Sequence, residues 1–472
     1  MESKTNATMF FRQYYLGCLS HASYMIGDIG SGRAAVVDPQ RDIAEYVADA
    51  EANGLTIVSI LETHFHADFL SGHLELAAAT GAEIGYGAAA DGRIGFPVTL
   101  YADGDEIALG DVVLEIRATP GHTPESISIV VHPNGRSSAP DAVLTGDTLF
   151  VGDVGRPDLL ASVGVSADEL GRQLYHSLHE RLMTLPDDVR VYPAHGAGSA
   201  CGKNLSTETS STIGEQRRTN YALAPMSEDE FVEAVTHGQA AAPMYFSFAA
   251  NRNREQHELF DDHRPLPLLS LAQVLEHQRN GAVVIDARDD VSFAAGHLRR
   301  SINIGLGGRF AEYAGAVVRA GTPIVLVTDP GHEHEAQTRL ARIGFDQVVG
   351  SLADPVESFL TNSWLVDQAS RLSVGQLASR LNTVPNLQLI DVRNPGETEN
   401  GTMPGAQLVS LSQLLDNLDA LDPNAPTVVH CAGGYRSSIA ASLLRANGFS
   451  DVSDLLGGYL AWTQPVRRTT EA

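Results

Sequence analysis

Histidine and aspartate side chains gather after apolar segments in the N-terminal half of the chain. His64, His66 and Asp68 follow the apolar run TIVSIL and stand two residues apart from one another. This spacing is typical of a metal site when further ligands arrive from elsewhere. Such donors follow three more apolar runs: His122, Asp147 and His195. Any one of them alone would be read as an ordinary loop residue. Because strand ends of a layered α/β sandwich meet at one edge, the combination predicts a metal ion there.

A second reactive group is the thiol of Cys431, which lies between the apolar run PTVVH and an amphipathic helical pattern. Backbone N–H groups and the dipole at a helix N-terminus stabilise a thiolate. The two glycines of Cys-Ala-Gly-Gly let the loop curl around the sulfur, and Arg436 adds a positive charge that could bind thiosulfate or sulfite. The alternative is a buried structural cysteine. The loop composition favours a nucleophile.

An internal repeat organises the C-terminal part of the 472-residue chain. Residues 283–304 and 389–411 each contain an apolar strand that ends in Asp-x-Arg, then a loop and a glycine-led turn. In both copies a second strand, a helix and a final strand follow. This alternation predicts two small α/β domains with parallel sheets. We expect a boundary near residue 264, within the charged and proline-containing run EQHELFDDHRPLP.

The first copy of the repeat lacks a thiol. Alignment of the two copies puts Asp329 opposite Cys431 and His334 opposite Arg436. An aspartate cannot carry a sulfane sulfur, and its charge would repel sulfite. We therefore expect this middle domain to pack the active modules together or to form an oligomer interface.

Composition excludes several classes of function. The formal net charge of −26 repels phosphate backbones and anionic lipid, so we expect neither nucleic acid nor membrane partners. No apolar run approaches the roughly 18 residues that span a bilayer, and the N-terminal sequence lacks the pattern of a signal peptide. Three sparse cysteines form no disulfide framework, which favours a cytoplasmic protein.

Residues 10–250 resemble the metallo-β-lactamase superfamily, whose Thr-His-x-His-x-Asp signature matches the segment Thr63 to Asp68. The superfamily includes zinc β-lactamases, glyoxalase II thioesterases and persulfide dioxygenases. Its two-metal members place a histidine directly after the aspartate of the signature, whereas this chain has Phe69. The loss of that ligand argues for a single metal ion.

Among these enzymes, persulfide dioxygenases match that arrangement. The resemblance implies one Fe(II) per chain, held by three residues: His64, His122 and Asp147. His66 and Asp68 would then support the ligands, and His195 would orient the substrate. Two histidines and one carboxylate leave three coordination positions open, which suits a non-haem ferrous ion that binds substrate and oxygen together.

Further stretches, VGDVGRPDLL and VYPAHG among them, also resemble persulfide dioxygenases. Arg156 matches the position of a cation near the glutathione carboxylate, with a loop salt bridge as the alternative. Tyr192 could line the pocket that binds glutathione, or it could belong to the hydrophobic core. Cys201 follows His195 by a short glycine-rich loop and could relay a persulfide sulfur, although an inert thiol is an equally good interpretation.

The segment His430-Cys431-Ala-Gly-Gly-Tyr-Arg436-Ser resembles the active loop of rhodaneses, which carry a persulfide on this cysteine. Asp391-Val-Arg393 matches another landmark of that family. The resemblance implies a catalytic set of Cys431, Arg436 and Asp391.

The combined prediction is an α/β protein in which a metallo-β-lactamase αββα sandwich (residues 1–255) precedes a rhodanese-like domain without the cysteine (265–362) and a catalytic rhodanese domain (368–472). It would oxidise glutathione persulfide or a similar persulfide with O₂ to sulfite, and transfer sulfane sulfur among persulfide, thiosulfate and sulfite. Related proteins imply a homodimer or homotetramer. Two alternatives stay open: a zinc thioesterase of the glyoxalase II type with sulfurtransferase modules, and a non-enzymatic sulfur sensor or scaffold.

Overall fold

The computed structural model describes residues 9–159, 164–239, 241–399 and 401–463. They form two compact units. The first unit contains the described residues up to 242 together with 246–262 and 341–344, and the second contains 243–245, 263–340 and the described residues from 345 onward. No helix of these described ranges is both long enough and apolar enough to cross a membrane.

The first unit is built on two six-stranded sheets. The first sheet has the order β1 (Met9–Leu16), β2 (His21–Asp28), β3 (Arg33–Val37), β4 (Thr56–Leu61), β5 (Glu83–Gly87) and β6 (Thr99–Tyr101). The second has the order β12 (Ser211–Thr212), β11 (Arg190–Pro193), β10 (Ala142–Gly146), β9 (Ile127–His132), β8 (Val113–Ala118) and β7 (Glu106–Ala108).

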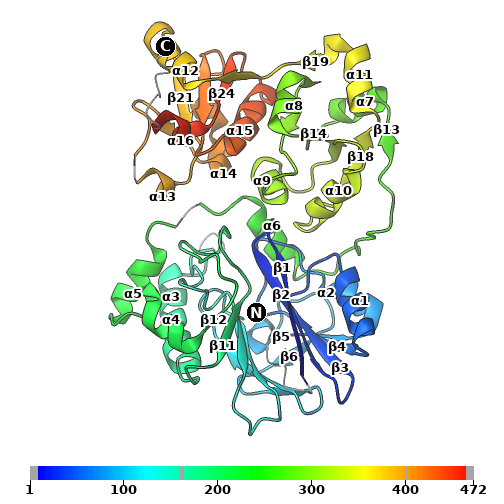
Figure 1. Ribbon diagram of the computed structural model, residues 1–472, viewed down its shortest axis with the longest axis vertical. Helices are drawn as coiled ribbons and strands as arrows, with labels where there is room; N and C mark the ends of the chain where they lie inside the picture. The colour runs from blue at the N-terminus through cyan, green and yellow to red at the C-terminus, as the bar shows by residue number, and fades with distance from the viewer. Residues whose placement is uncertain (1–8, 160–163, 240, 400, 464–472) are drawn as a thin grey trace, which may run out of the picture. The chain divides into compact units, whose positions relative to one another are not determined.

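Helices cover the outer face of each sheet (Figure 1). Beside the first sheet lie α1 (Ala44–Ala52) and α2 (His73–Thr80); beside the second lie α3 (Ala167–His176), α4 (Ile213–Thr219) and α5 (Glu228–Thr236). Among the described residues before 263, further helices are η1 (Ala88–Ala90), η3 (Ser177–Leu182), η4 (Tyr221–Leu223) and α6 (Tyr245–Arg252). The αββα architecture predicted from the sequence is confirmed.

The central strands of the two sheets contribute side chains to a core on each of their faces. In β2, Tyr24 and Ile26 belong to the core between the two sheets, whereas Met25 belongs to the core under α1 and α2. In β9, Ile129 faces the first of these cores and Val130 faces the helices of the other side. Successive side chains of a strand point to opposite faces, so each central strand must be apolar throughout.

The strand ends that carry the predicted metal ligands meet at one edge of the sandwich. The backbone N–H of Ile127 donates to the carbonyl of Thr63 across the two sheets at 2.9 Å, and that of Ala194 donates to Gly146 at 3.0 Å. Gly146 has a φ of 51°, and a Cβ there would lie 2.7 Å from the Thr63 hydroxyl. The edge can close so tightly only because this position is a glycine.

The second unit contains two five-stranded sheets of parallel strands. The first has the order β13 (Leu268–Leu269), β18 (Val348–Leu352), β17 (Ile324–Val327), β14 (Val283–Asp286) and β16 (Ile302–Asn303). The second has the order β20 (Ser370–Leu372), β24 (Val452–Leu455), β23 (Thr427–His430), β21 (Gln388–Asp391) and β22 (Gln407–Leu408). A short antiparallel pair joins β15 (His297–Leu298) to β19 (Val366–Asp367).

Helices alternate with these strands, as the repeat predicts. Around the first sheet they are α7 (Leu271–Arg279), α8 (Asp290–Ala295), α9 (Phe310–Val317), α10 (Glu333–Ala341), α11 (Pro355–Thr361) and η5 (Ser363–Leu365). Around the second they are α12 (Val374–Thr383), α13 (Pro395–Thr398), α14 (Leu411–Leu414), η6 (Leu415–Ala420), α15 (Tyr435–Ala446) and α16 (Gly458–Thr463).

The strand register corrects one detail of the repeat alignment. Asp286 pairs with Val327 in the first sheet, and Asp391 pairs with His430 in the second. The residue opposite Cys431 is therefore Thr328 and not Asp329. The alignment was wrong by one position because the loop between strand and helix is one residue longer in the first copy. A threonine hydroxyl cannot carry a sulfane sulfur either, so the middle domain still has no nucleophile at this position.

Candidate metal centre

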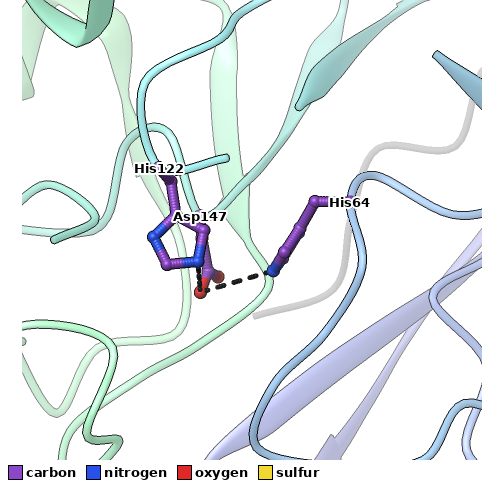
Figure 2. A group of neighbouring side chains, drawn as sticks. All are labelled: His64, His122 and Asp147. Atoms are coloured by element: carbon purple, nitrogen blue, oxygen red, sulfur yellow. Dashed lines mark ion pairs between the residues drawn. The ribbon is translucent and has the colours of Figure 1, made fainter. Parts of the chain in front are cut away.

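His64, His122 and Asp147 converge at the closed edge of the sandwich. They follow β4, β8 and β10, and all three side chains are buried. The Nε2 atoms of His64 and His122 lie 3.8 and 3.5 Å from Oδ2 of Asp147 (Figure 2). A cation bound at about 2.1 Å with roughly right angles places its ligand atoms about 3 Å apart. A small inward rotation of the three side chains would satisfy that geometry.

Hydrogen bonds leave the metal-facing atom of each ligand free. The Thr63 hydroxyl donates its only proton to Asp38 at 2.9 Å, so it accepts from Nδ1 of His64, also at 2.9 Å. The carbonyl of Arg156 accepts from Nδ1 of His122 at 2.9 Å. Both histidines therefore present the lone pair of Nε2 to the centre, as metal-binding histidines do.

Asp147 is oriented in the same way. Its Oδ1 accepts from Nδ1 of His195 at 2.7 Å, while its Oδ2 faces the two histidines. Oδ2 of Asp147 and Nε2 of His64 are buried without a hydrogen-bond partner among the described residues. Buried polar atoms left unpaired are costly. A metal ion would satisfy both, so these residues fit one.

The electrostatics give the three ligands the protonation states that a cation requires. Burial lowers the pKa of His64 and of His122, so both rings are neutral. Burial alone would raise the pKa of Asp147, but the charge of His195 and its hydrogen bond outweigh that effect and lower it. The donor set is therefore two neutral imidazoles and one carboxylate.

A further buried group, Asp68, His195 and Cys201, adjoins the triad. Nε2 of His195 lies 2.7 Å from Asp68, so this histidine bridges Asp68 and Asp147. Burial, followed by the charges of Asp68 and Asp147, raises the pKa of Cys201 well above its usual value. Phe69 is buried beside His66, with ring centroids 4.4 Å apart. Among the residues that the structure describes, Asp38, Glu62 and His66 form another buried group of this kind.

The loop around Cys431 follows β23 and leads into α15. Gly434 donates its backbone N–H to the cysteine sulfur at 3.1 Å, and the Ser437 hydroxyl lies 3.7 Å from it. The thiol is 2% exposed. Arg436, at the start of α15, is held by two hydrogen bonds of 2.6 Å to the carboxylate of Glu397. An anion that bound Arg436 would compete with Glu397.

Comparisons with known proteins identify the domains that contain these two groups of residues. The model of the metallo-beta-lactamase superfamily matches residues 16–195, and that of the rhodanese-like domain matches 270–360 and 373–465. Human "Persulfide dioxygenase ETHE1, mitochondrial" is 32% identical over 255 residues, which cover 53% of this chain and 89% of the human protein. The chain belongs to the metallo-beta-lactamase superfamily. Within it, the N-terminal half is homologous to persulfide dioxygenases, and two rhodanese-like domains follow.

Two other relatives show the breadth of this superfamily. A crystal structure of a metallo-beta-lactamase from Staphylococcus aureus subsp. aureus COL has 32% identity and a TM-score of 0.66, and the match covers 73% of this chain and 98% of that one. The hydroxyacylglutathione hydrolase of Methylococcus capsulatus is 37% identical over 175 residues, covering 36% of this chain and 60% of the hydrolase. The superfamily thus joins dioxygenases and hydrolases on one fold.

The predicted substrate residues of the metallo-beta-lactamase domain have other partners in the structure. Arg156 makes two hydrogen bonds to Asp158, at 2.7 and 2.6 Å, which is the loop salt bridge weighed as the alternative. Tyr192 is half-buried, packs its ring 4.7 Å from that of Phe11, and accepts a hydrogen bond from Arg190. A substrate role for either residue stays a prediction.

Asp391 lies in the last rhodanese-like domain, where Arg393 donates hydrogen bonds to both of its carboxylate oxygens. Arg393 also donates to the carbonyl of Gly401 at 3.0 Å. In the middle domain Arg288 binds Asp286 and the carbonyl of Gly296 in the same way. Since the pair also occurs in the domain without a thiol, its contacts support the fold. A catalytic role for Asp391 stays a prediction.

Sequence reasoning missed the two acidic residues that contact Thr63 and His66. Asp38 accepts hydrogen bonds from the backbone N–H and the hydroxyl of Thr63 and lies 3.0 Å from Nε2 of His66. Glu62 lies 3.5 Å from the same nitrogen. Asp38 directly follows the apolar run AAVV, as the ligands follow theirs, so the same signal could have identified it.

Proposed function

We propose that the metallo-beta-lactamase domain is a persulfide dioxygenase with one ferrous ion, and that the last domain transfers sulfane sulfur through Cys431. The first reaction is RSSH + O₂ + H₂O → RSH + SO₃²⁻ + 2H⁺, with glutathione persulfide as the model substrate. The sulfur supplies all the electrons, so no external reductant is needed. The observation that carries the proposal is the buried triad of His64, His122 and Asp147, in a chain that has Phe69 where two-metal members have a further histidine.

The chain's own residues would hold and orient the reactants. The three ligands would bind the iron, which supplies a redox-active centre where persulfide and oxygen can meet. Thr63 and the carbonyl of Arg156 fix the two imidazoles, and His195 fixes Asp147. For Arg156 to bind a glutathione carboxylate, that carboxylate would have to replace Asp158. Cys201, which lies beside Asp68 and His195, would relay persulfide sulfur.

Sulfur transfer at Cys431 would use two displacements. The thiolate attacks the outer sulfur of a persulfide, a Cys431 S–S bond forms, and the thiol leaves. Sulfite then attacks that outer sulfur, so thiosulfate leaves and the thiolate returns. The reverse direction would make persulfide from thiosulfate and thiol and so supply the dioxygenase. Both directions balance without an added oxidant or reductant.

A zinc hydrolase of the glyoxalase II type is the second candidate. The likeness to a hydroxyacylglutathione hydrolase and the adjoining group of Asp68, His195 and Cys201 favour it. Phe69 argues against it, because the position that follows the signature aspartate offers no imidazole.

Oxygen uptake on glutathione persulfide, measured with thioester hydrolysis on the same preparation, separates these functions. The dioxygenase proposal predicts oxygen consumption with sulfite formation and no thioester cleavage. Thioester cleavage without oxygen uptake would support the zinc hydrolase. The absence of both activities would support the non-enzymatic sensor or scaffold. The cytoplasmic location, which the three free cysteines favour, and the dimer or tetramer stay predictions.

A further inference from the structure

A cavity of about 290 Å³ lies between the two rhodanese-like domains, within the second unit. Val283 at the start of β14 and Ile302 at the start of β16 line it from the middle domain. Leu443 and Ala446, in the last turn of α15, line it from the last domain. Cys431 precedes the other end of this 12-residue helix, which is about 18 Å long. The cavity is therefore separate from the sulfur-transfer loop.

The charged groups that line this cavity are positive, although the chain as a whole has a net charge of −26. Arg300 and Arg319 line it, and no carboxylate is among its lining residues that the structure describes. Arg319 forms an exposed ion pair with Asp416 at 2.8 Å. The side chain of Arg300 has no hydrogen-bond or ion-pair partner within the described ranges. Its guanidinium can therefore bind an anion without giving up another contact.

The backbone of Arg300 indicates a role for its side chain. Its φ is 65°, in the left-handed region that is unfavourable for L-residues other than glycine. Aspartate and asparagine tolerate this region best, and they account for three other described residues with a positive φ: Asp38, Asp354 and Asn386. Arginine has no such tolerance, and no described partner of its side chain offsets the strain. Backbone strain that contacts do not explain points to a functional reason for the residue.

The size and the lining of the cavity restrict the ligand. Ligand pockets typically occupy about 300–1,000 Å³, so this cavity suits a compact molecule. The aliphatic side chains of Val283, Ile302 and Leu443 favour an apolar body, because burial of apolar surface against them is favourable. Thiosulfate and sulfite have no such body. A guanidinium binds a carboxylate through two parallel hydrogen bonds, so a small organic acid with an apolar body fits both parts of the cavity.

We propose that this cavity binds a compact organic carboxylate. Arg300 holds the carboxylate group, and the apolar body packs against the starts of β14 and β16 and the last turn of α15. Arg319 adds positive charge to the lining while it keeps its ion pair with Asp416. Because residues of both rhodanese-like domains line the cavity, the bound acid joins these domains. Such a site goes beyond the proposed sulfur chemistry and does not depend on it.

The test is a calorimetric titration of the iron-loaded full chain with benzoate, which combines a carboxylate with an apolar ring. We expect one benzoate to bind to each cavity. Sulfate lacks the apolar body and benzyl alcohol lacks the charge, so each should bind at least about 10-fold more weakly. Saturating benzoate should also raise the melting temperature, because it binds the folded protein. No binding of benzoate, or equal binding of sulfate or benzyl alcohol, would overturn the inference.

Three variants locate the bound benzoate. Arg300→Asn removes the guanidinium and suits the left-handed backbone, so it should weaken binding at least about 10-fold and leave the melting temperature of the unliganded protein at or above that of wild type. Ala446→Phe keeps both arginines, fills the cavity and should block binding.

Arg299→Gln is the matched control, since this neighbouring exposed arginine pairs with Asp367 at 3.0 Å and does not line the cavity. It should bind benzoate like wild type. Benzoate bound to the iron or to Arg436 would not depend on Arg300. Wild-type affinity in Arg300→Asn or in Ala446→Phe, or an equal loss in Arg299→Gln, would therefore overturn the inference.

Discussion

Replacing Thr63 by valine tests whether the hydrogen bond from His64 to Thr63 strengthens metal binding. The substitution keeps the shape of the side chain and removes the hydroxyl that accepts from His64 and donates to Asp38. Without this acceptor the His64 ring can rotate, and its tautomer is no longer fixed. Loss of a supporting partner of this kind typically weakens metal binding about 10–100-fold.

The same substitution should destabilise the metal-free protein. It leaves Nδ1 of His64 and Oδ2 of Asp38 buried without their Thr63 partner, at about 1–3 kcal/mol for each group. We therefore expect the free energy of unfolding to fall by about 2–6 kcal/mol. Denaturant titration of the metal-free protein and anaerobic competition for Fe(II) with a chelator measure the two effects separately.

Ser23→Ala provides the matched control for Thr63→Val. Ser23 is a buried hydroxyl of the same unit, bonded to Tyr46 at 2.6 Å, and it is not a partner of any metal ligand. This variant should lose stability and keep its iron affinity. If Thr63→Val binds iron as tightly as wild type, or if Ser23→Ala weakens binding equally, the reasoning about ligand orientation is refuted.

Three further substitutions test other parts of the two sites. Phe69→His should raise the metal bound from one to two ions per chain, and an unchanged stoichiometry would show that Phe69 does not limit metal number. Glu397→Ala should free Arg436 and raise kcat/KM for thiosulfate about 10-fold; a fall would mean instead that Glu397 orients the guanidinium. Cys201→Ser should reduce the yield of sulfite per oxygen consumed if the thiol relays sulfur, and unchanged turnover and coupling would dismiss the relay.

Local patterns in the sequence were sufficient to predict the sandwich and the convergence of the candidate metal ligands. A polar residue within a few positions after an apolar strand lies near the strand end wherever the sheet is placed, so His64, His122 and Asp147 could be predicted to lie together. The strand–helix alternation of the repeat likewise predicts parallel sheets, because each connection needs a crossover. Both features depend on near neighbours in the chain.

Contacts between distant segments could not be predicted in the same way. Glu397 and Arg436 are 39 residues apart, and Tyr435 and Gly305 are 130 apart, so no local pattern joins them. The error over Thr328 has a related cause, since loop length is set by how the following helix packs. Asp158 stands only two residues from Arg156, yet the geometry that pairs them depends on the folded loop.

The most direct test of the central claim is an iron titration of the metal-free protein under anaerobic conditions, followed by oxygen uptake on glutathione persulfide. We expect the initial rate to rise linearly and to break at one iron per chain, with zinc inactive and Asp147→Ala inactive at any iron concentration. A break at two metal ions per chain, activity with zinc, or full sulfite formation by Asp147→Ala would contradict the account.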